Sequence, residues 1–275
     1  MPTVTLPNAT LHYDVSGQGD PTVLIHGSLV DGQTWNAVRP GLEQALLTLT
    51  YDRRGHGESV GPPRTHAVRD DAQDLAGLLE TIDLFPVHLV AHSYGGAVAL
   101  RLATDRPEMV RSLALHEPPF IGLLEEDPAT VPEAERLWAS LEDIRRLARD
   151  GAREAAVRSI VESLTTEDDP WSRLSPEVRR TLSAHLGRWE EEMGDPEASR
   201  PSPEILADLL IPVLLTSGER SPPFLRRIVE RMSTHLRNAT VREIAGAGHV
   251  PHVSDPDLFV AFIYGFLVER NVPVT

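Results

Sequence analysis

The stretch LVAHSYGGAVAL, residues 89–100, places one serine between an apolar run and a run of small residues. Gly95 and Gly96 follow this serine closely and suit a sharp turn from a strand into a helix. A Ser93 hydroxyl on such a turn would lie at a helix N-terminus, where developing negative charge is stabilised. Because Ala91 replaces the first glycine of the Gly-x-Ser-x-Gly pattern, an ordinary N-cap serine is the alternative interpretation.

A nucleophilic serine needs a base, and the segment GAGHVPHVSDPDLF offers one late in the chain. His249 lies in a short Gly-rich loop between the last expected strand and the final helix, so its imidazole can turn toward Ser93. A loop histidine without a role is the alternative for His249. His252 is a second candidate base, although we expect it to pack or to cap a helix.

Backbone amides that could stabilise an oxyanion are also present. His26 and Gly27 end an early expected strand, and Ser28 follows them. The amide of Ser28, beside that of Tyr94, could donate to a negatively charged oxygen. No histidine has a carboxylate at ligand spacing on a clear helix face, so we expect neither a metal nor a cofactor.

Buried strands that alternate with helices are expected to position these residues. Short runs rich in Val, Leu and Ile alternate with amphipathic stretches, and crossovers of a dozen or more residues predict a mostly parallel sheet flanked by helices. Residues 3–15 predict an opening hairpin. The expected strands are 22–27, 46–52, 87–93, 110–117, 209–218 and 239–246, and the expected helices include 66–84, 95–106, 224–236 and 256–270.

Residues 118–205 interrupt this alternation, because they contain acidic and arginine-rich helical stretches and no strand-like run. We therefore expect residues 1–117 and 206–275 to form one α/β core and residues 118–205 to form a helical cap. Ligands bind at the C-terminal edge of a parallel sheet, so an insertion there is expected to cover a site. The charged runs of the insertion are expected to be solvated helix faces.

Composition excludes several other classes of protein. The 275 residues carry a formal net charge of −15, which disfavours nucleic acid and anionic membrane surfaces as partners. All 26 basic residues are arginine and no cysteine is present, so lysine Schiff bases, disulfides and cysteine nucleophiles are excluded. No basic region precedes an apolar stretch at the N-terminus, and we expect a cytoplasmic protein without a membrane segment.

The chain resembles the α/β-hydrolase superfamily over nearly its full length. The resemblance rests on VLIHG, YDRRGHGES, VAHSYGG and GAGHVPH, which occur in the family's order and spacing. It implies the α/β-hydrolase fold with a helical lid. It also implies that Ser93 is the nucleophile, that His249 is the general base, and that the amides of Ser28 and Tyr94 form the oxyanion hole.

The acid of the triad departs from the common family pattern. Most members carry an aspartate in a Gly-x-x-Asp turn, where this chain has Ser221. Glu219 lies in the same turn, and Glu117 ends the strand after the serine's helix. The segment ALHEPPF resembles the haloalkane dehalogenase and zearalenone-lactonase branches, whose acid ends that strand. We expect Glu117 to orient His249, with Glu219 as the second candidate and a solvated strand-end glutamate as the alternative.

These residues predict a serine hydrolase that cleaves a small-molecule carboxylic ester or lactone through an acyl-enzyme on Ser93. A carbon–carbon bond hydrolase with the same triad order is a second possibility, but its members usually keep the aspartate that Ser221 replaces. A non-catalytic ligand receptor on the same scaffold is a third. No motif encodes the substrate, the oligomeric state or the organism.

Overall fold

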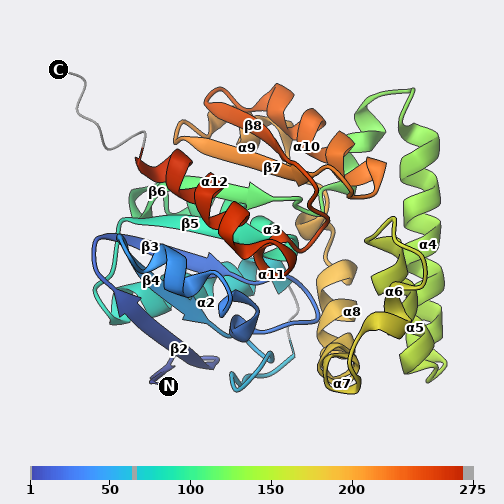
Figure 1. Cartoon of the computed structure of the whole chain (residues 1–275), viewed down its shortest axis with the longest axis horizontal. Coiled ribbons are helices and arrows are strands. Elements are labelled where there is room, and N and C mark those ends of the chain that lie inside the picture. The colour runs from blue at the N-terminus through green and yellow to red at the C-terminus, as the bar shows by residue number, and fades with distance from the viewer. Residues whose placement is uncertain (1, 64–66, 269–275) are drawn as a thin grey trace.

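A computed structural model describes residues 2–63 and 67–268 and, within them, an eight-stranded sheet (Figure 1). β1 pairs antiparallel with β2, β2 pairs antiparallel with β4, and the other neighbouring strands are parallel. The expected mostly parallel sheet is therefore confirmed. In the sheet order β1-β2-β4-β3-β5-β6-β7-β8, the strands are Thr3–Thr5, Thr10–Gly17, Leu46–Tyr51, Asp20–Ile25, Val87–His92, Val110–His116, Val213–Gly218 and Ala239–Ile244.

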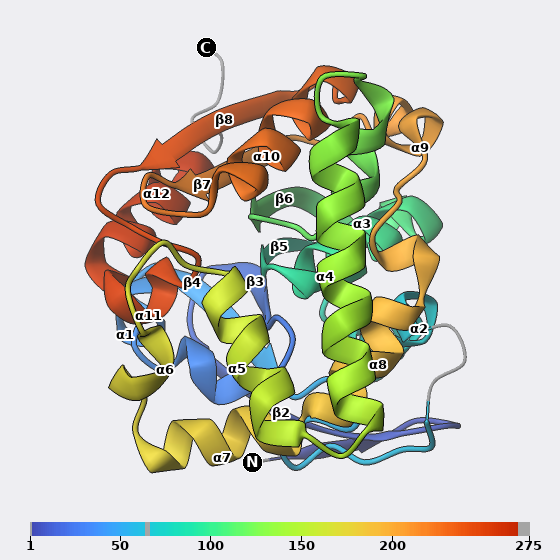
Figure 2. The ribbon, with the colours of Figure 1, turned by 90° about the vertical axis from the view of Figure 1, so that its right-hand side faces the viewer.

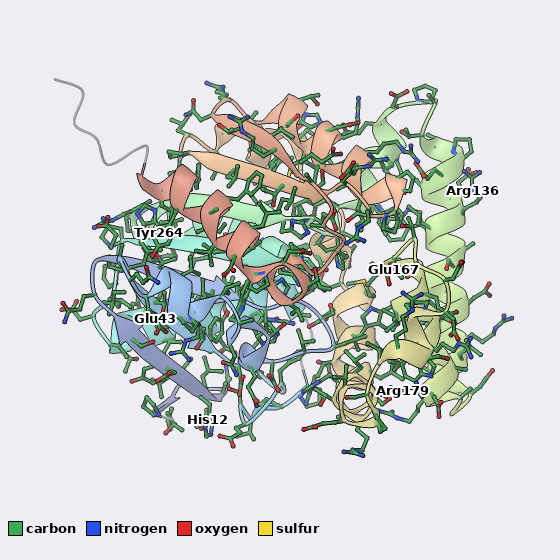
Figure 3. The ribbon with its side chains drawn as sticks, viewed as in Figure 1. His12, Glu43, Arg136, Glu167, Arg179 and Tyr264 are labelled. Carbon is green, nitrogen blue, oxygen red and sulfur yellow. The ribbon has the colours of Figure 1, made fainter. Side chains whose placement is uncertain are left out.

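Helices cover both faces of the sheet because successive strand residues point to opposite sides. Leu89 belongs to a hydrophobic cluster that includes side chains of α2, α3 and α10 on one face, whereas Val90 belongs to a second cluster that includes side chains of α1 and α12 on the other. The Tyr264 hydroxyl, labelled in Figure 3, ties α12 to α1 by donating to the Gly41 and Leu42 carbonyls at 2.6 and 2.8 Å. These helices are α1 Arg39–Leu42, α2 Ala67–Thr81, α3 Tyr94–Asp105, α10 Pro223–His235, α11 Pro251–Ser254 and α12 Pro256–Val268, with 3-10 turns at Gly32–Trp35 and Pro107–Met109.

The chain between β6 and β7 is helical and contains no strand in residues 117–212, all of which are described. Figure 2 shows α4 and α5 in front of the sheet, with α7 along the lower edge and α8 behind α4, and Figure 3 labels Arg136, Glu167 and Arg179 in this layer. We call α4 to α8 the inserted helices. They are α4 Val131–Arg149, α5 Arg153–Ser163, α6 Pro170–Arg173, α7 Pro176–Ala184 and α8 Leu186–Gly194; α9 Pro203–Asp208 and 3-10 turns at Ile121–Glu126 and Pro196–Ala198 complete the segment.

The inserted helices have a hydrophobic cluster of their own, which includes Trp171 and Trp189. Leu29, from the loop after β3, is the core residue that enters this cluster. The insertion is therefore packed onto the ends of the parallel strands. None of the helices in the described ranges is both long and apolar enough to cross a membrane.

Helix α3 lies unusually close to strand β3 at its first turn. A Cβ atom added to Gly95 would lie 2.8 Å from the His26 carbonyl oxygen and closer still to that of Ile25. Both are backbone atoms that cannot move without displacing the strand. A glycine at this position is therefore required for the approach.

We predict that Gly95→Ala lowers the free energy of unfolding by about 1–3 kcal/mol, because the added methyl group overpacks this contact. Urea unfolding at neutral pH measures the change. Gly187→Ala is the matched control, since Gly187 is also the second residue of a helix but has no atom within 4 Å of its added Cβ. The control should be neutral or stabilising by about 0.5–1 kcal/mol. Equal effects of the two substitutions would contradict the steric explanation.

Candidate functional site

Ser93 lies on a strained turn between β5 and α3. Its φ of 51° and ψ of −123° place a non-glycine residue in a sparsely populated backbone conformation. The Ser93 amide donates to the His116 carbonyl at 2.9 Å, which fixes the turn against β6. The side chain makes no capping hydrogen bond to α3, so the N-cap interpretation does not describe this serine.

Glu117 and His249 are brought together although 132 residues separate them. Glu117 directly follows β6, is fully buried, and accepts a hydrogen bond from His249 Nδ1 at 2.7 Å on Oε2. Its Oε1 accepts from the Gly218 amide at 2.8 Å. An ionised carboxylate can only accept, so His249 carries its proton on Nδ1 and Nε2 is left as the basic nitrogen.

The surroundings of Glu117 keep its carboxylate charged. Burial alone would raise its pKa, but the hydrogen bond from His249 and the nearby His116 ring outweigh burial, and Ser221 contributes as well. Together they lower the pKa of Glu117 to about 2. Glu219 is placed differently: its carboxylate is exposed and accepts from the Gly246 amide at 2.7 Å. Of the two candidate acids, Glu117 is the one bonded to His249.

The loop that carries His249 is held against the residue preceding Ser93. His92 Nε2 lies 2.8 Å from the His249 carbonyl oxygen, and the two rings are 4.7 Å apart between centroids. Among the described residues, no hydrogen bond joins the Ser93 hydroxyl to the His249 imidazole. Such contacts are often long in an enzyme without substrate and tighten when substrate binds.

The loop after β3 passes directly beside Ser93. A Cβ atom added to Gly27 would lie 3.2 Å from Ser93 Cβ and 2.8 Å from His92 Nδ1. Ser28 follows in this loop, and Tyr94 is the first residue of α3. The two amides expected to form an oxyanion hole therefore lie in the two segments that flank Ser93.

Residues 22–262 of the chain match the alpha/beta hydrolase family. The chain belongs to this family. An uncharacterized protein of Mycobacterium tuberculosis is 34% identical over 116 residues, which cover 40% of this alpha/beta hydrolase and 34% of the relative. The match therefore spans only about a third of the length of that curated relative.

Two solved structures support the fold. An N-acyl homoserine lactone degrading enzyme has a TM-score of 0.78 at 21% identity, covering 97% of this alpha/beta hydrolase and 100% of the other chain. A thermophilic esterase from Thermogutta terrifontis has a TM-score of 0.75 at 24% identity, covering 98% and 99%. At these identities the likeness is one of fold.

The expectation that the charged runs of the insertion are solvated is wrong for Glu192. Its side chain, on α8, is fully buried and lies 2.7 Å from Arg53 Nη2 and 2.5 Å from the Ser28 hydroxyl. The sequence held a signal, because Glu192 follows Trp189 by three residues and so lies on the same helix face as that apolar side chain. Because three glutamates are adjacent in the segment WEEEM, the sequence did not single out Glu192 as the buried one.

Histidines pack around the Glu117–His249 pair. His252, the second candidate base, is fully buried, packs against Trp35 with the two rings tilted, and lies 3.0 Å from the Thr34 hydroxyl through Nε2, so it packs as expected. Ligand atoms of His116, Glu117 and His249 lie within 4.8 Å of one another. Within this group, the carboxylate of Glu117 is bonded to His249 Nδ1.

We predict that these buried histidines make the fold sensitive to mild acid. Burial lowers the pKa of His116 to about 4 and that of His252 to about 3, from an ordinary value of 6.5. The unfolded chain therefore binds protons below pH 6.5 that the folded chain does not, so stability falls as the pH drops from 6.5 toward 4. Each histidine should contribute up to about 1.4 kcal/mol per pH unit.

Urea unfolding between about pH 7 and pH 5 measures this slope. His252→Gln should make it shallower, because one proton-binding difference between the folded and unfolded chains is removed. His12→Gln serves as the control, since His12 is partly exposed and pairs with Glu58 at 3.0 Å. A wild-type slope in His252→Gln would refute the prediction.

Proposed function

We propose that this alpha/beta hydrolase is a serine hydrolase that cleaves a small-molecule carboxylic ester or lactone through an acyl-enzyme on Ser93. The observation that carries the proposal is the 2.7 Å hydrogen bond between the buried Glu117 carboxylate and His249 Nδ1, formed beside a strained serine. A carboxylate in this position fixes the imidazole tautomer and stabilises the imidazolium that forms during proton transfer.

In the proposed reaction, the Ser93 oxygen attacks the carbonyl carbon of the substrate while His249 Nε2 accepts the serine proton. His249 then donates this proton to the leaving alcohol oxygen as the carbon–oxygen bond breaks. Water, deprotonated by His249, then attacks the acyl-enzyme, and His249 returns this proton to the Ser93 oxygen as the acyl–oxygen bond breaks and the acid leaves. Glu117 stays ionised throughout, in keeping with its pKa of about 2.

The amides of Ser28 and Tyr94 are proposed to stabilise the oxyanion that each attack creates. Preorganised amide donors aimed at a developing charge contribute about 3–4 kcal/mol each in well-studied hydrolases. The position of Tyr94 at the start of α3 adds the positive end of the helix dipole. Both proposed donors thus come from segments that lie next to Ser93.

The substrate class is inferred from the chemistry and from the fold neighbours. A lactone-degrading enzyme and an esterase share the fold over nearly the full chain. We further propose that residues 118–205 act as a cap over the site, because their helices pack on the loop that follows β3. With a net charge of −15, a small molecule is a better partner than nucleic acid or an anionic membrane.

A fluorophosphonate probe tests the nucleophile. We expect one adduct on the wild-type chain by intact mass, with the label on Ser93 by peptide mapping, because only an activated serine attacks phosphorus at a useful rate. Ser93→Ala should take up no label. If the wild-type chain takes up no label, the non-catalytic receptor is the interpretation that remains. In that case the protein should not turn over p-nitrophenyl acetate either.

Replacing the acid tests the triad. Glu117→Gln should lower kcat for p-nitrophenyl acetate by about 10²- to 10⁴-fold, because a neutral amide neither fixes the His249 tautomer nor stabilises the imidazolium. Glu219→Gln is the matched control and should stay within about twofold of wild type. Circular dichroism confirms that both variants are folded. The reverse pattern would assign the acid to Glu219.

A further inference from the structure

One face of α8 docks onto two loops at the edge of the sheet. His185, which precedes the helix, lies 3.2 Å through Nδ1 from the Leu29 carbonyl oxygen and accepts from the Gly57 amide at 3.2 Å through Nε2. Glu192 follows His185 by seven residues, two helical turns, and so lies on the same face. The face therefore contacts both the loop after β3 and the loop after β4.

Glu192 contacts the residue whose amide is proposed to bind the oxyanion. Its Oε2 accepts a hydrogen bond from the Ser28 hydroxyl at 2.5 Å, and its Oε1 lies 2.7 Å from Arg53 Nη2. The same Arg53 nitrogen donates to the Gly27 carbonyl oxygen at 2.9 Å. Glu192 thus contacts Ser28 directly and Gly27 through one guanidinium group.

The contacts of the Gly27 carbonyl also determine the direction of the Ser28 amide. The Gly27 carbonyl and the Ser28 N–H belong to one planar trans unit, in which the two bonds point in opposite directions. His26 Nδ1, at 2.8 Å, and Arg53 Nη2 both contact the Gly27 oxygen. Fixing the carbonyl therefore fixes the direction of the Ser28 amide, on a loop that passes beside Ser93.

The backbone conformation of Leu29, the next residue of this loop, depends on contacts with the cap. Leu29 has a φ of 64°, a left-handed conformation that is unfavourable for a leucine. Its side chain is buried in the hydrophobic cluster of the cap with Trp171 and Trp189. The strained backbone is held in place by contacts that come from the cap rather than from the core.

We propose that Glu192 is a positioning residue, which holds the Gly27–Ser28 peptide so that the Ser28 amide faces the oxyanion when α8 is docked. The inference rests on the proposed function of Ser93. It goes beyond that function by making the cap a part of the oxyanion hole. A donor aimed at the transition state contributes to kcat rather than to ground-state binding.

The test compares Glu192→Gln and Ser28→Ala with wild type on p-nitrophenyl acetate, with kcat expressed per active site titrated by the p-nitrophenol burst. We expect both substitutions to lower kcat by about 10- to 100-fold with KM changed less than about threefold. Ser28→Ala removes the hydroxyl alone and leaves the Arg53 pair intact, so it tests the inference even where Glu192→Gln folds poorly. Ser28→Thr should restore most of the rate.

Two controls separate positioning from loss of structure. Glu190→Gln changes the same residue type on the same helix and should keep the wild-type kcat. Ser112→Ala removes a buried serine hydroxyl that lies 2.7 Å from His88 Nδ1, away from the site, and should do the same. The double variant Ser28→Ala/Glu192→Gln should be no slower than Glu192→Gln alone, because the Ser28 hydroxyl acts through Glu192.

The outcomes for the two proposals are distinct. A wild-type chain that takes up no fluorophosphonate and makes no burst would overturn the proposed function. A wild-type chain that reacts, together with Ser28→Ala and Glu192→Gln variants of unchanged kcat, would overturn the positioning role and leave the nucleophile standing. A rise in KM at constant kcat would also overturn it, since that result assigns Glu192 to substrate binding.

Discussion

The buried carboxylate of Glu117 constrains the architecture around it, because a buried charge is costly unless it is paired and hydrogen-bonded. Its partners come from two other elements: His249 from the loop after β8, and the Gly218 amide from the end of β7. Glu117 itself directly follows the last residue of β6. Three neighbouring parallel strands must therefore end at one level for a single carboxylate to be satisfied, and the same level places Ser93, after β5, beside them.

Much of this arrangement follows from sequence, because buried parallel strands are continuous apolar runs and their carboxyl ends meet at one edge. Small residues around Ser93 and His249 indicated the turns that carry them. Ranking Glu117 above Glu219 needed a resemblance to other hydrolases, since both carboxylates follow apolar strands in the sequence. Only the fold shows that one is buried against His249 and that the other is exposed beside Gly246.

The contacts of the inserted helices could not be predicted in the same way. Helices in residues 118–205 are evident from periodicity, but periodicity does not say which core loop a helix face meets. Glu192 belongs to a run of three glutamates, and in sequence each of them is typical of a solvated surface. Its burial depends on Arg53, 139 residues away in the chain, which is itself buried and pairs with Asp71 at 2.7 Å. Partners this distant are set by docking rather than by local pattern.

Charged and apolar contacts both fix the position of the inserted helices on the core. Leu29 in the cluster of Trp171 and Trp189 provides burial, which is non-directional and tolerates a small slide of one element past another. The Arg53–Glu192 pair adds little net stability, because desolvation offsets most of its attraction. A slide of α8 by one residue, about 1.5 Å, would nevertheless lengthen the 2.7 Å contact and leave the buried Glu192 carboxylate poorly compensated, although Arg53 would keep its pair with Asp71. Apolar burial thus keeps the inserted helices attached, and the ion pair favours the register in which the Ser28 hydroxyl contacts Glu192.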